Sequence, residues 1–119
     1  MIQNHFILQM YNAIDAKSST GMCNFLTDDA IFKFANMPAV EGKANIISFL
    51  DGFFQSIKAI SHTNIETWNS GDVWFVTGNV SYTRHNDSVL KVPFSVLLRM
   101  RASLIKEFQI FVDASELYK

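Results

Sequence analysis

The spacing of apolar residues changes near residue 60 of the chain. Before that point apolar residues recur at helical spacing, first over residues 5–15 and again over residues 46–57. The first stripe consists of Phe6, Ile7, Met10 and Ile14, and the second of Ile46, Ile47, Leu50, Phe53, Phe54 and Ile57. After residue 60 four segments are rich in β-branched and aromatic residues, and the turn-like sequences SGD and HNDS lie between them. The first half therefore predicts helices and the second half predicts strands.

Shorter elements fill the space between the two helical stripes. The sequence KSSTG interrupts the pattern, and Ser19 or Thr20 is suited to cap a second, short helix that carries Met22, Phe25 and Leu26. The run AIFKF then alternates as a short strand does. A loop from Asn36 to Gly42 leads into the long helix.

Four long strands joined by short turns predict an antiparallel meander. With the helices of the first half covering one face of this sheet, the fold class is α+β, in a single domain over residues 1–119. The segment VPFSVLLRM carries apolar residues in both phases of the strand, including Leu97. A sheet that met only water on its outer face would alternate more cleanly, so we expect a homodimer formed through that face.

The composition excludes several classes of function. Ten Lys and Arg residues oppose eleven Asp and Glu residues, so no net field attracts nucleic acid or an anionic membrane. The single cysteine, Cys23, excludes an internal disulfide and is expected to be a core thiol. Three scattered histidines lack metal-ligand spacing, and we expect neither a metal nor another cofactor. The start, MIQNHFILQM, is too short and polar for a signal peptide, which favours a cytoplasmic location.

Four phrases spread along the chain carry a family resemblance: FLTDDAIF, VEGKANIISF, GDVWFVTGNVSYTR and LIKEFQIFVD. In their order and spacing they resemble the nuclear-transport-factor-2-like superfamily, in its SnoaL-like and ketosteroid-isomerase-like branch. The resemblance implies a cone-shaped, cystatin-like roll, in which a curved antiparallel or mixed sheet wraps around a long helix and two N-terminal helices. It also implies a deep apolar pocket that holds a small ring-containing molecule.

The acidic residues of the family's enzymes are missing at the matching positions. The resemblance places the general base of ketosteroid isomerases at Phe34 and their oxyanion-binding acid at Ser95 or Val96. The acid/base residue of SnoaL-type cyclases and epoxide hydrolases falls on Ile110. The arginine of the epoxide hydrolases matches Arg84, but its aspartate partner falls on Asn86.

Other acidic residues are read as structural. Asp28 and Asp29 are expected at the end of the second helix, where their side chains bond nearby backbone N–H groups and turn the chain. Asp113 lies on the strand parity opposite to Phe108, and with Glu116 it has the spacing of a capping box at a helix start.

Two polar residues remain as weak catalytic candidates. Tyr11 matches the oxyanion-binding tyrosine of ketosteroid isomerases, although it is equally well read as a packed tyrosine whose hydroxyl is satisfied. His62 is the best titratable base near the expected pocket mouth, although a capping role between helix and strand is favoured. His5 and His85 are expected to be exposed to solvent.

Strand parity and the resemblance together define the expected pocket. Arg84 shares a face with Tyr82 and would favour an anionic group on the ligand if it reached the rim. The expected pocket residues are Tyr11, Phe34, His62, Val80, Tyr82, Arg84, Phe108 and Ile110.

Three classes of function remain open. The first is a non-enzymatic protein that binds a small apolar or ring-containing ligand. The second is an isomerase, cyclase or dehydratase that uses Tyr11 and His62. The third is a dimeric interaction module whose own side chains fill the pocket. The missing acids favour the first and third, and an open cavity of about 300 Å³ or more would favour binding over the interaction module.

Overall fold

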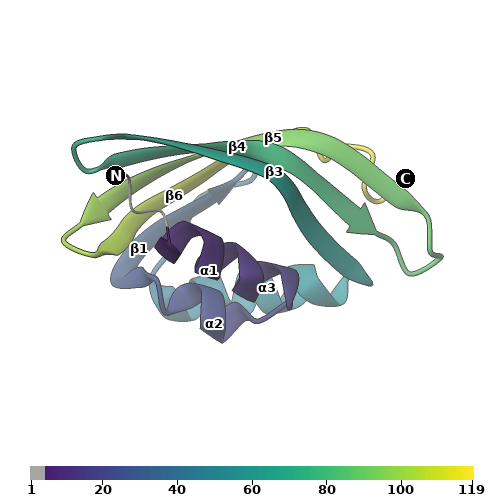
Figure 1. Cartoon of the computed structure of the whole chain (residues 1–119). Helices are drawn as coiled ribbons and strands as arrows, with labels where there is room; N and C mark the ends of the chain where they lie inside the picture. Colours follow the sequence, from purple (N-terminus) through teal and green to yellow (C-terminus); the bar gives the residue numbers. More distant parts are fainter. Residues whose placement is uncertain (1–4) are drawn as a thin grey trace.

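The computed structural model describes residues 5–119, and the first four residues of the segment MIQNHFILQM lie outside this range. Three helices lie on one side of a six-stranded sheet that arches over them (Figure 1). The helices are α1 (His5–Asp15), α2 (Ser19–Cys23) and α3 (Lys43–Gln55). The strands are β1 (Leu26–Phe34), β2 (Val40–Glu41), β3 (Ala59–Ser70), β4 (Val73–Thr83), β5 (Val89–Arg101) and β6 (Leu104–Val112).

The strand order is β2-β1-β6-β5-β4-β3. Strands β3 to β6 form the predicted antiparallel meander, while β1 pairs in parallel with β6 and antiparallel with β2. The sheet is therefore mixed, and the predicted α+β architecture is confirmed. Among residues 5–119, no helix is both long enough and apolar enough to span a bilayer.

The core lies between the helices and the inner face of the sheet. Helix α1 buries Ile7, Met10, Tyr11 and Ile14, which are spaced three or four residues apart on one side of the helix. Strand β4 buries alternate residues, including Trp74, Val76, Val80 and Tyr82, because successive side chains point to opposite faces. The apolar residues at helical spacing and those that alternate along the strands are thus buried in one shared core.

Strand β3 passes very close to Gly78 of β4. The pairing of these strands shifts its register between Thr63 and Glu66. A Cβ atom on Gly78 would lie 2.8 Å from the backbone oxygen of Thr63 and 2.9 Å from the ring of Phe94. Glycine is needed here because two backbones and an aromatic ring approach one another closely.

The second helix is shorter than predicted. Ser18, not Ser19 or Thr20, is the N-cap, and its hydroxyl accepts a hydrogen bond of 3.0 Å from the backbone N–H of Gly21. The helix ends at Cys23, so that Leu26 already belongs to β1.

Asp28 and Asp29 lie within β1 and not in a turn after the second helix, so their expected position was wrong. The carboxylate of Asp28 lies 3.5 Å from the Lys43 ammonium, and Asp29 pairs with Arg101. Both aspartates are exposed, so these ion pairs tie neighbouring surface elements together.

The segment after β6 does not begin a helix. The backbone N–H of Ser115 donates to Asp113 Oδ1 over 3.1 Å, which makes a local turn in place of the expected helical capping box. Leu117 is buried and anchors this segment to the core.

Candidate active site

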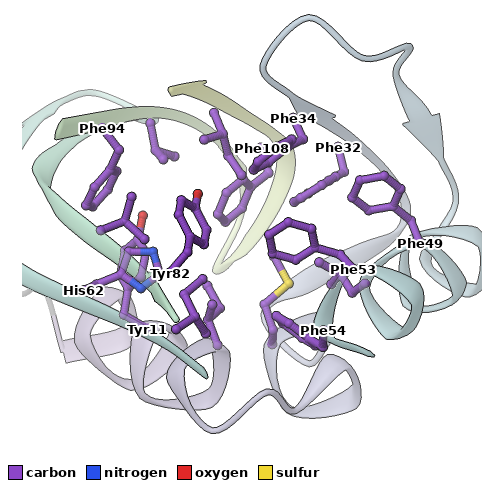
Figure 2. A pocket seen from close by; sticks show the side chains of 17 residues that line it. Tyr11, Phe32, Phe34, Phe49, Phe53, Phe54, His62, Tyr82, Phe94 and Phe108 are labelled. Atoms are coloured by element: carbon purple, nitrogen blue, oxygen red, sulfur yellow. The ribbon is translucent and has the colours of Figure 1, made fainter. Parts of the chain in front are cut away.

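A small cavity lies between α1, α3 and the inner face of the sheet. The side chains around it are almost all aromatic or aliphatic, and they come from three helices and five strands (Figure 2). Of the residues expected from sequence, this lining includes Tyr11, Phe34, His62, Val80, Tyr82, Phe108 and Ile110. Most of these positions follow from strand parity, because they lie on the inner face of β1, β4 and β6.

The free volume inside the cavity is about 50 Å³. This is well below the ~300 Å³ at which sites for small molecules begin, and below the ~150 Å³ of a cavity that accepts benzene. Aromatic rings take up much of the interior: the ring centroid of Phe32 lies 5.6 Å from that of Phe49 and 5.4 Å from that of Phe108. In this conformation the cavity holds a water-sized group but no ring.

His62 faces the cavity from β3 and is held there by Asp15 at the end of α1. The Nδ1 atom of His62 lies 2.6 Å from Asp15 Oδ1, and the backbone N–H of His62 donates to Asp15 Oδ2 over 3.1 Å. The His62 side chain is 9% exposed and that of Asp15 29%. His62 therefore does not cap a helix, since the C-cap of α3 is Ser56.

The contact with Asp15 determines which nitrogen of His62 can act as a base. An ionised carboxylate only accepts hydrogen bonds, so the Nδ1 atom of His62 carries the proton in this pair. In the neutral ring Nε2 then holds the free lone pair. A histidine oriented in this way by a carboxylate is the arrangement of a general base.

Sequence reasoning did not identify Asp15. Asp15 follows Tyr11 by four residues on α1, so the two side chains share one side of the helix. That spacing was the available signal. The partner of Asp15, however, lies 47 residues away, and no local pattern connects them.

Tyr11 lies against His62 with an unpaired hydroxyl. The two ring centroids are 4.6 Å apart. The Tyr11 hydroxyl is buried and has no hydrogen-bond partner, so the expectation of a satisfied hydroxyl was wrong. Burial, with a smaller contribution from the charge of Asp15, raises the pKa of Tyr11 above its ordinary value. The phenol stays neutral and can donate a hydrogen bond to a group in the cavity.

The wall of the cavity is apolar at the positions where the family resemblance would place acids. Phe34, Val96 and Ile110 all line it, whereas Ser95 is not part of the lining. The chemistry available to the cavity therefore comes from Tyr11 and His62, with Asp15 behind the imidazole.

Arg84 lies outside the cavity, so its expected place at the rim was wrong. Its guanidinium donates to the backbone oxygens of Leu117 and Glu116 over 2.9 and 2.8 Å. These bonds tie the turn after β4 to the C-terminal segment. The expectation of an anionic ligand group, which rested on Arg84, loses its basis.

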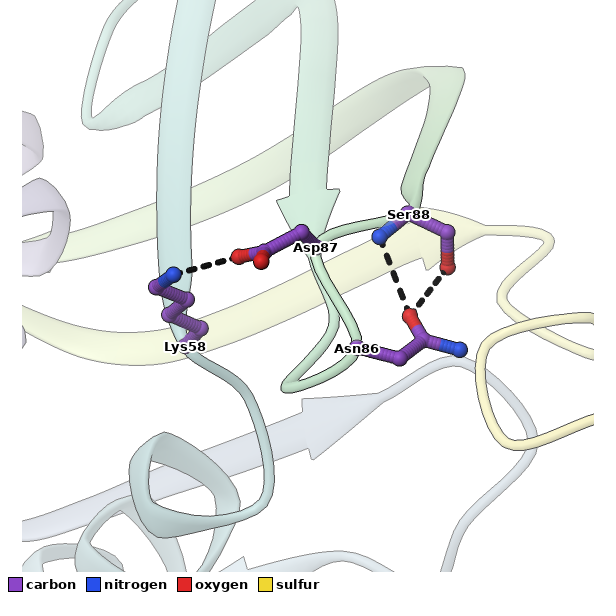
Figure 3. A network of polar contacts seen from close by, with 4 residues as sticks. All are labelled: Lys58, Asn86, Asp87 and Ser88. Carbon is purple, nitrogen blue, oxygen red and sulfur yellow. Dashed lines mark hydrogen bonds and ion pairs between the residues drawn. The ribbon is translucent and has the colours of Figure 1, made fainter.

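Asn86, which falls at the aspartate position of the epoxide hydrolases, also has a local role. Its side-chain oxygen accepts bonds from the backbone N–H and the hydroxyl of Ser88, over 3.0 and 2.6 Å (Figure 3). In the same turn Asp87 pairs with Lys58, which precedes β3. This network stabilises the turn and is remote from the cavity lining.

The remaining titratable candidates are also placed by the structure. Burial raises the pKa of Cys23 to about 11, as expected for a core thiol. His5 and His85 are exposed. Within residues 5–119 no three His, Cys, Asp or Glu side chains gather as metal ligands would.

The chain matches a family of known domains over most of its length. The family described as the SnoaL-like domain matches residues 7–108. No curated protein sequence matches the chain.

Solved structures share the fold at low sequence identity. One is described as a candidate polyketide cyclase from Xanthomonas campestris pv. campestris; it has 18% identity and a TM-score of 0.88, with 96% of this chain and 92% of that chain covered. Another is TerC, co-crystallised with polyporic acid, at 16% identity and a TM-score of 0.85, with coverage of 96% and 93%. A third is described as a candidate isomerase from Bacillus subtilis, at 14% identity and a TM-score of 0.82, with coverage of 93% and 86%.

Proposed function

The chain belongs to the SnoaL-like domain family, and from that premise we propose that it is an enzyme of the isomerase or cyclase kind that moves a proton on a small ring-containing carbonyl compound. His62 is the proposed base and Tyr11 the proposed oxyanion donor. Because the cavity is too small for a ring in this conformation, the substrate enters when phenylalanines of the cavity wall change rotamer. The observation that carries this proposal is the contact of 2.6 Å between Asp15 and His62 beside the unpaired hydroxyl of Tyr11.

The proposed reaction balances its protons and electrons within the substrate. His62 Nε2 takes a proton from the carbon next to the carbonyl, and the electrons of the broken C–H bond form a C=C bond. The carbonyl electrons move to the oxygen, where the negative charge receives a hydrogen bond from the Tyr11 hydroxyl. The imidazolium, stabilised by Asp15, then returns its proton to a carbon of the same molecule.

An unpaired buried hydroxyl is unfavourable in a protein whose interior is only packed. A buried hydroxyl without a partner costs about 1–3 kcal/mol. The Tyr11 hydroxyl would be useful during turnover, when an oxyanion develops next to it. Together with the orientation of His62 by Asp15, which ligand binding alone does not require, this supports catalysis over the non-enzymatic binder that the missing acids favoured.

A second candidate function is the dimeric interaction module. It is favoured by the free volume of only about 50 Å³, which leaves the cavity nearly filled by its own side chains. It gives no reason for the Asp15–His62 pair, whose two hydrogen bonds hold a histidine against the cavity.

We also propose that the chain forms a homodimer through the outer face of the sheet. Trp68 and Phe75 are directly paired on β3 and β4, and they are 53% and 49% exposed. Phe111 of β6 is also exposed. Large aromatic side chains on one sheet face are typical of an interface. The cytoplasmic location stays a prediction from sequence.

The exchange of carbon-bound protons tests the proposed chemistry. With 2-tetralone as the probe, in D₂O, wild-type protein should accelerate deuterium uptake next to the carbonyl, as followed by ¹H NMR. Replacement of the base in His62→Gln should slow the catalysed exchange by about 100-fold or more. The exposed His85 gives a matched control, and His85→Gln should keep the wild-type rate. Equal rates in wild type and His62→Gln would refute the proposal.

A further inference from the structure

A second hollow lies beside the cavity and is much wider. We call it the outer groove; it runs between α3, the loop after β1 and the segment after β6, and its free volume is about 720 Å³. This volume is within the range of about 300–1,000 Å³ that is usual for small-molecule sites. The inner cavity, at about 50 Å³, has the chemical groups but not the room.

Three phenylalanines separate the two spaces. Phe34, Phe49 and Phe53 line both the inner cavity and the outer groove. The ring of Phe34 lies 5.3 Å from that of Phe53 and 6.5 Å from that of Phe49, centroid to centroid. All three are partly exposed, and Figure 2 shows them across the cavity from His62. Side chains held only by ring contacts can change rotamer without breaking a hydrogen bond.

We propose that the inner cavity and the outer groove are two parts of one elongated binding site, and that its ligand is a ring joined to an apolar chain with an uncharged or cationic end. The inference rests on the proposed function for the position of the ring. The ring lies beside Tyr11 and His62, in space that opens when the phenylalanines between the cavity and the groove change rotamer. The apolar chain of the ligand passes the three phenylalanines and lies in the outer groove.

The charge of the groove determines the preferred end of the chain. Asp113 is the one charged residue among the described residues that line the groove. Hydrogen bonds from Ser115, with a smaller contribution from the charge of Lys119, which is not part of the groove lining, hold the pKa of Asp113 below its ordinary value, so the carboxylate is ionised at neutral pH. The rest of the polar lining is neutral and includes Asn36, Ser48, Ser56 and Tyr118. An anionic end would be repelled, whereas a hydroxyl or an ammonium group would be accepted.

Gly52 offers a way to block the groove without disturbing the fold. It lies on α3 and lines the groove, and a Cβ atom there would meet nothing within 4 Å. Gly52→Trp would therefore fill the groove with an indole ring. Gly52→Ala is the matched control, because it also replaces the helical glycine but adds only a methyl group.

The experiment compares the affinities of phenol, 4-hexylphenol and 6-(4-hydroxyphenyl)hexanoate by calorimetry, with the ¹⁵N signals of His62 reporting the position of the ring. In wild type and Gly52→Ala, 4-hexylphenol should bind at least about 10-fold more tightly than phenol, because several methylene groups leave water. The hexanoate should bind more weakly than 4-hexylphenol. In Gly52→Trp the advantage of the chain should be lost while phenol binds as before. Equal affinities of phenol and 4-hexylphenol in wild type, or an unchanged chain advantage in Gly52→Trp, would overturn the proposal.

This experiment can fail separately from the test of catalysis. The affinities of phenol and 4-hexylphenol should also be measured in His62→Gln. There 4-hexylphenol should still bind more tightly than phenol, because the groove is unchanged. One outcome would refute the proposed function alone: Gly52→Trp loses the tighter binding of 4-hexylphenol, but wild type does not exchange the protons of 2-tetralone. Exchange of 2-tetralone without a chain advantage would refute the elongated site alone.

Discussion

The hydroxyl of Tyr11 is the residue-scale feature that most clearly separates function from stability. The hydroxyl is buried and has no hydrogen-bond partner, while the ring that carries it packs against His62 and Phe94. A group that only stabilised the fold would be bonded, because an unpaired buried hydroxyl costs free energy. Phenylalanine would keep the ring contacts and remove the cost.

We therefore predict opposite effects of Tyr11→Phe on stability and on activity. The free energy of unfolding should rise by about 1 kcal/mol, because an unpaired hydroxyl is removed from the core. Exchange of 2-tetralone should slow by about 100-fold, because the oxyanion loses its donor. Urea unfolding and the NMR exchange assay measure the two quantities. A variant that is less stable than wild type would show that the hydroxyl has a hydrogen-bond partner.

At the same scale, the sequence predicted the apolar side chains of the site better than its chemistry. Val80 shares a face with Tyr82, and Ile110 with Phe108, by strand alternation, which is a local property; the family resemblance turned these faces and Phe34 toward the cavity. The Asp15–His62 contact joins the end of a helix to a strand 47 residues later and depends on how those elements pack. The predicted position of Arg84 was wrong for a related reason. Strand parity placed its side chain inward, but backbone oxygens of the C-terminal segment bind its guanidinium outside the cavity.

At the scale of elements, the turn-like sequences and the spacing of apolar residues were sufficient to predict the long helices and strands. The meander from β3 to β6 and the helices α1 and α3 were expected close to their observed bounds. The two-residue strand β2 was missed because two residues carry no period. The parallel pairing of β1 with β6 was not predicted either, because it joins distant segments of the chain.

Strands β3 and β4 approach closely at Gly78, near the point where β3 shifts its register against β4. We predict that Gly78→Ala destabilises the protein by about 2 kcal/mol, because the new methyl group would overlap the Thr63 carbonyl and the Phe94 ring. Chemical denaturation measures the change. Gly52→Ala is the control: its methyl group meets nothing within 4 Å, and the gain in helix propensity should leave the stability equal or higher. Equal stabilities of the two variants would show that the strands separate readily at Gly78.

At the scale of the whole molecule, the two faces of the sheet have different roles. The inner face forms the cavity with α1 and α3, whereas the outer face presents aromatic side chains to solvent. An exposed pair such as Trp68 and Phe75 is unfavourable in water unless a second surface covers it.

We predict that the protein in solution has a mass of about 27 kDa, twice the 13.5 kDa of one chain. Phe75→Glu should shift it to the monomer, because a buried carboxylate in the interface would be unpaired. Light scattering after size-exclusion chromatography measures both masses. Leu8→Glu is the control, since Leu8 is exposed on α1, which lies on the other side of the sheet (Figure 1). A monomeric wild type would contradict the proposed interface.

The central claim is that Asp15 acts on the substrate only through His62, so that the two form one catalytic unit. The most direct test measures the exchange of 2-tetralone in Asp15→Asn, in His62→Gln and in the double variant. In Asp15→Asn the rate of 2-tetralone exchange should fall at least about 10-fold, because the imidazole is no longer oriented by a charge. The double variant should be no slower than His62→Gln alone, because a positioning residue has no effect once the base is gone. Losses that multiply in the double variant would contradict the claim, since Asp15 would then act independently of His62.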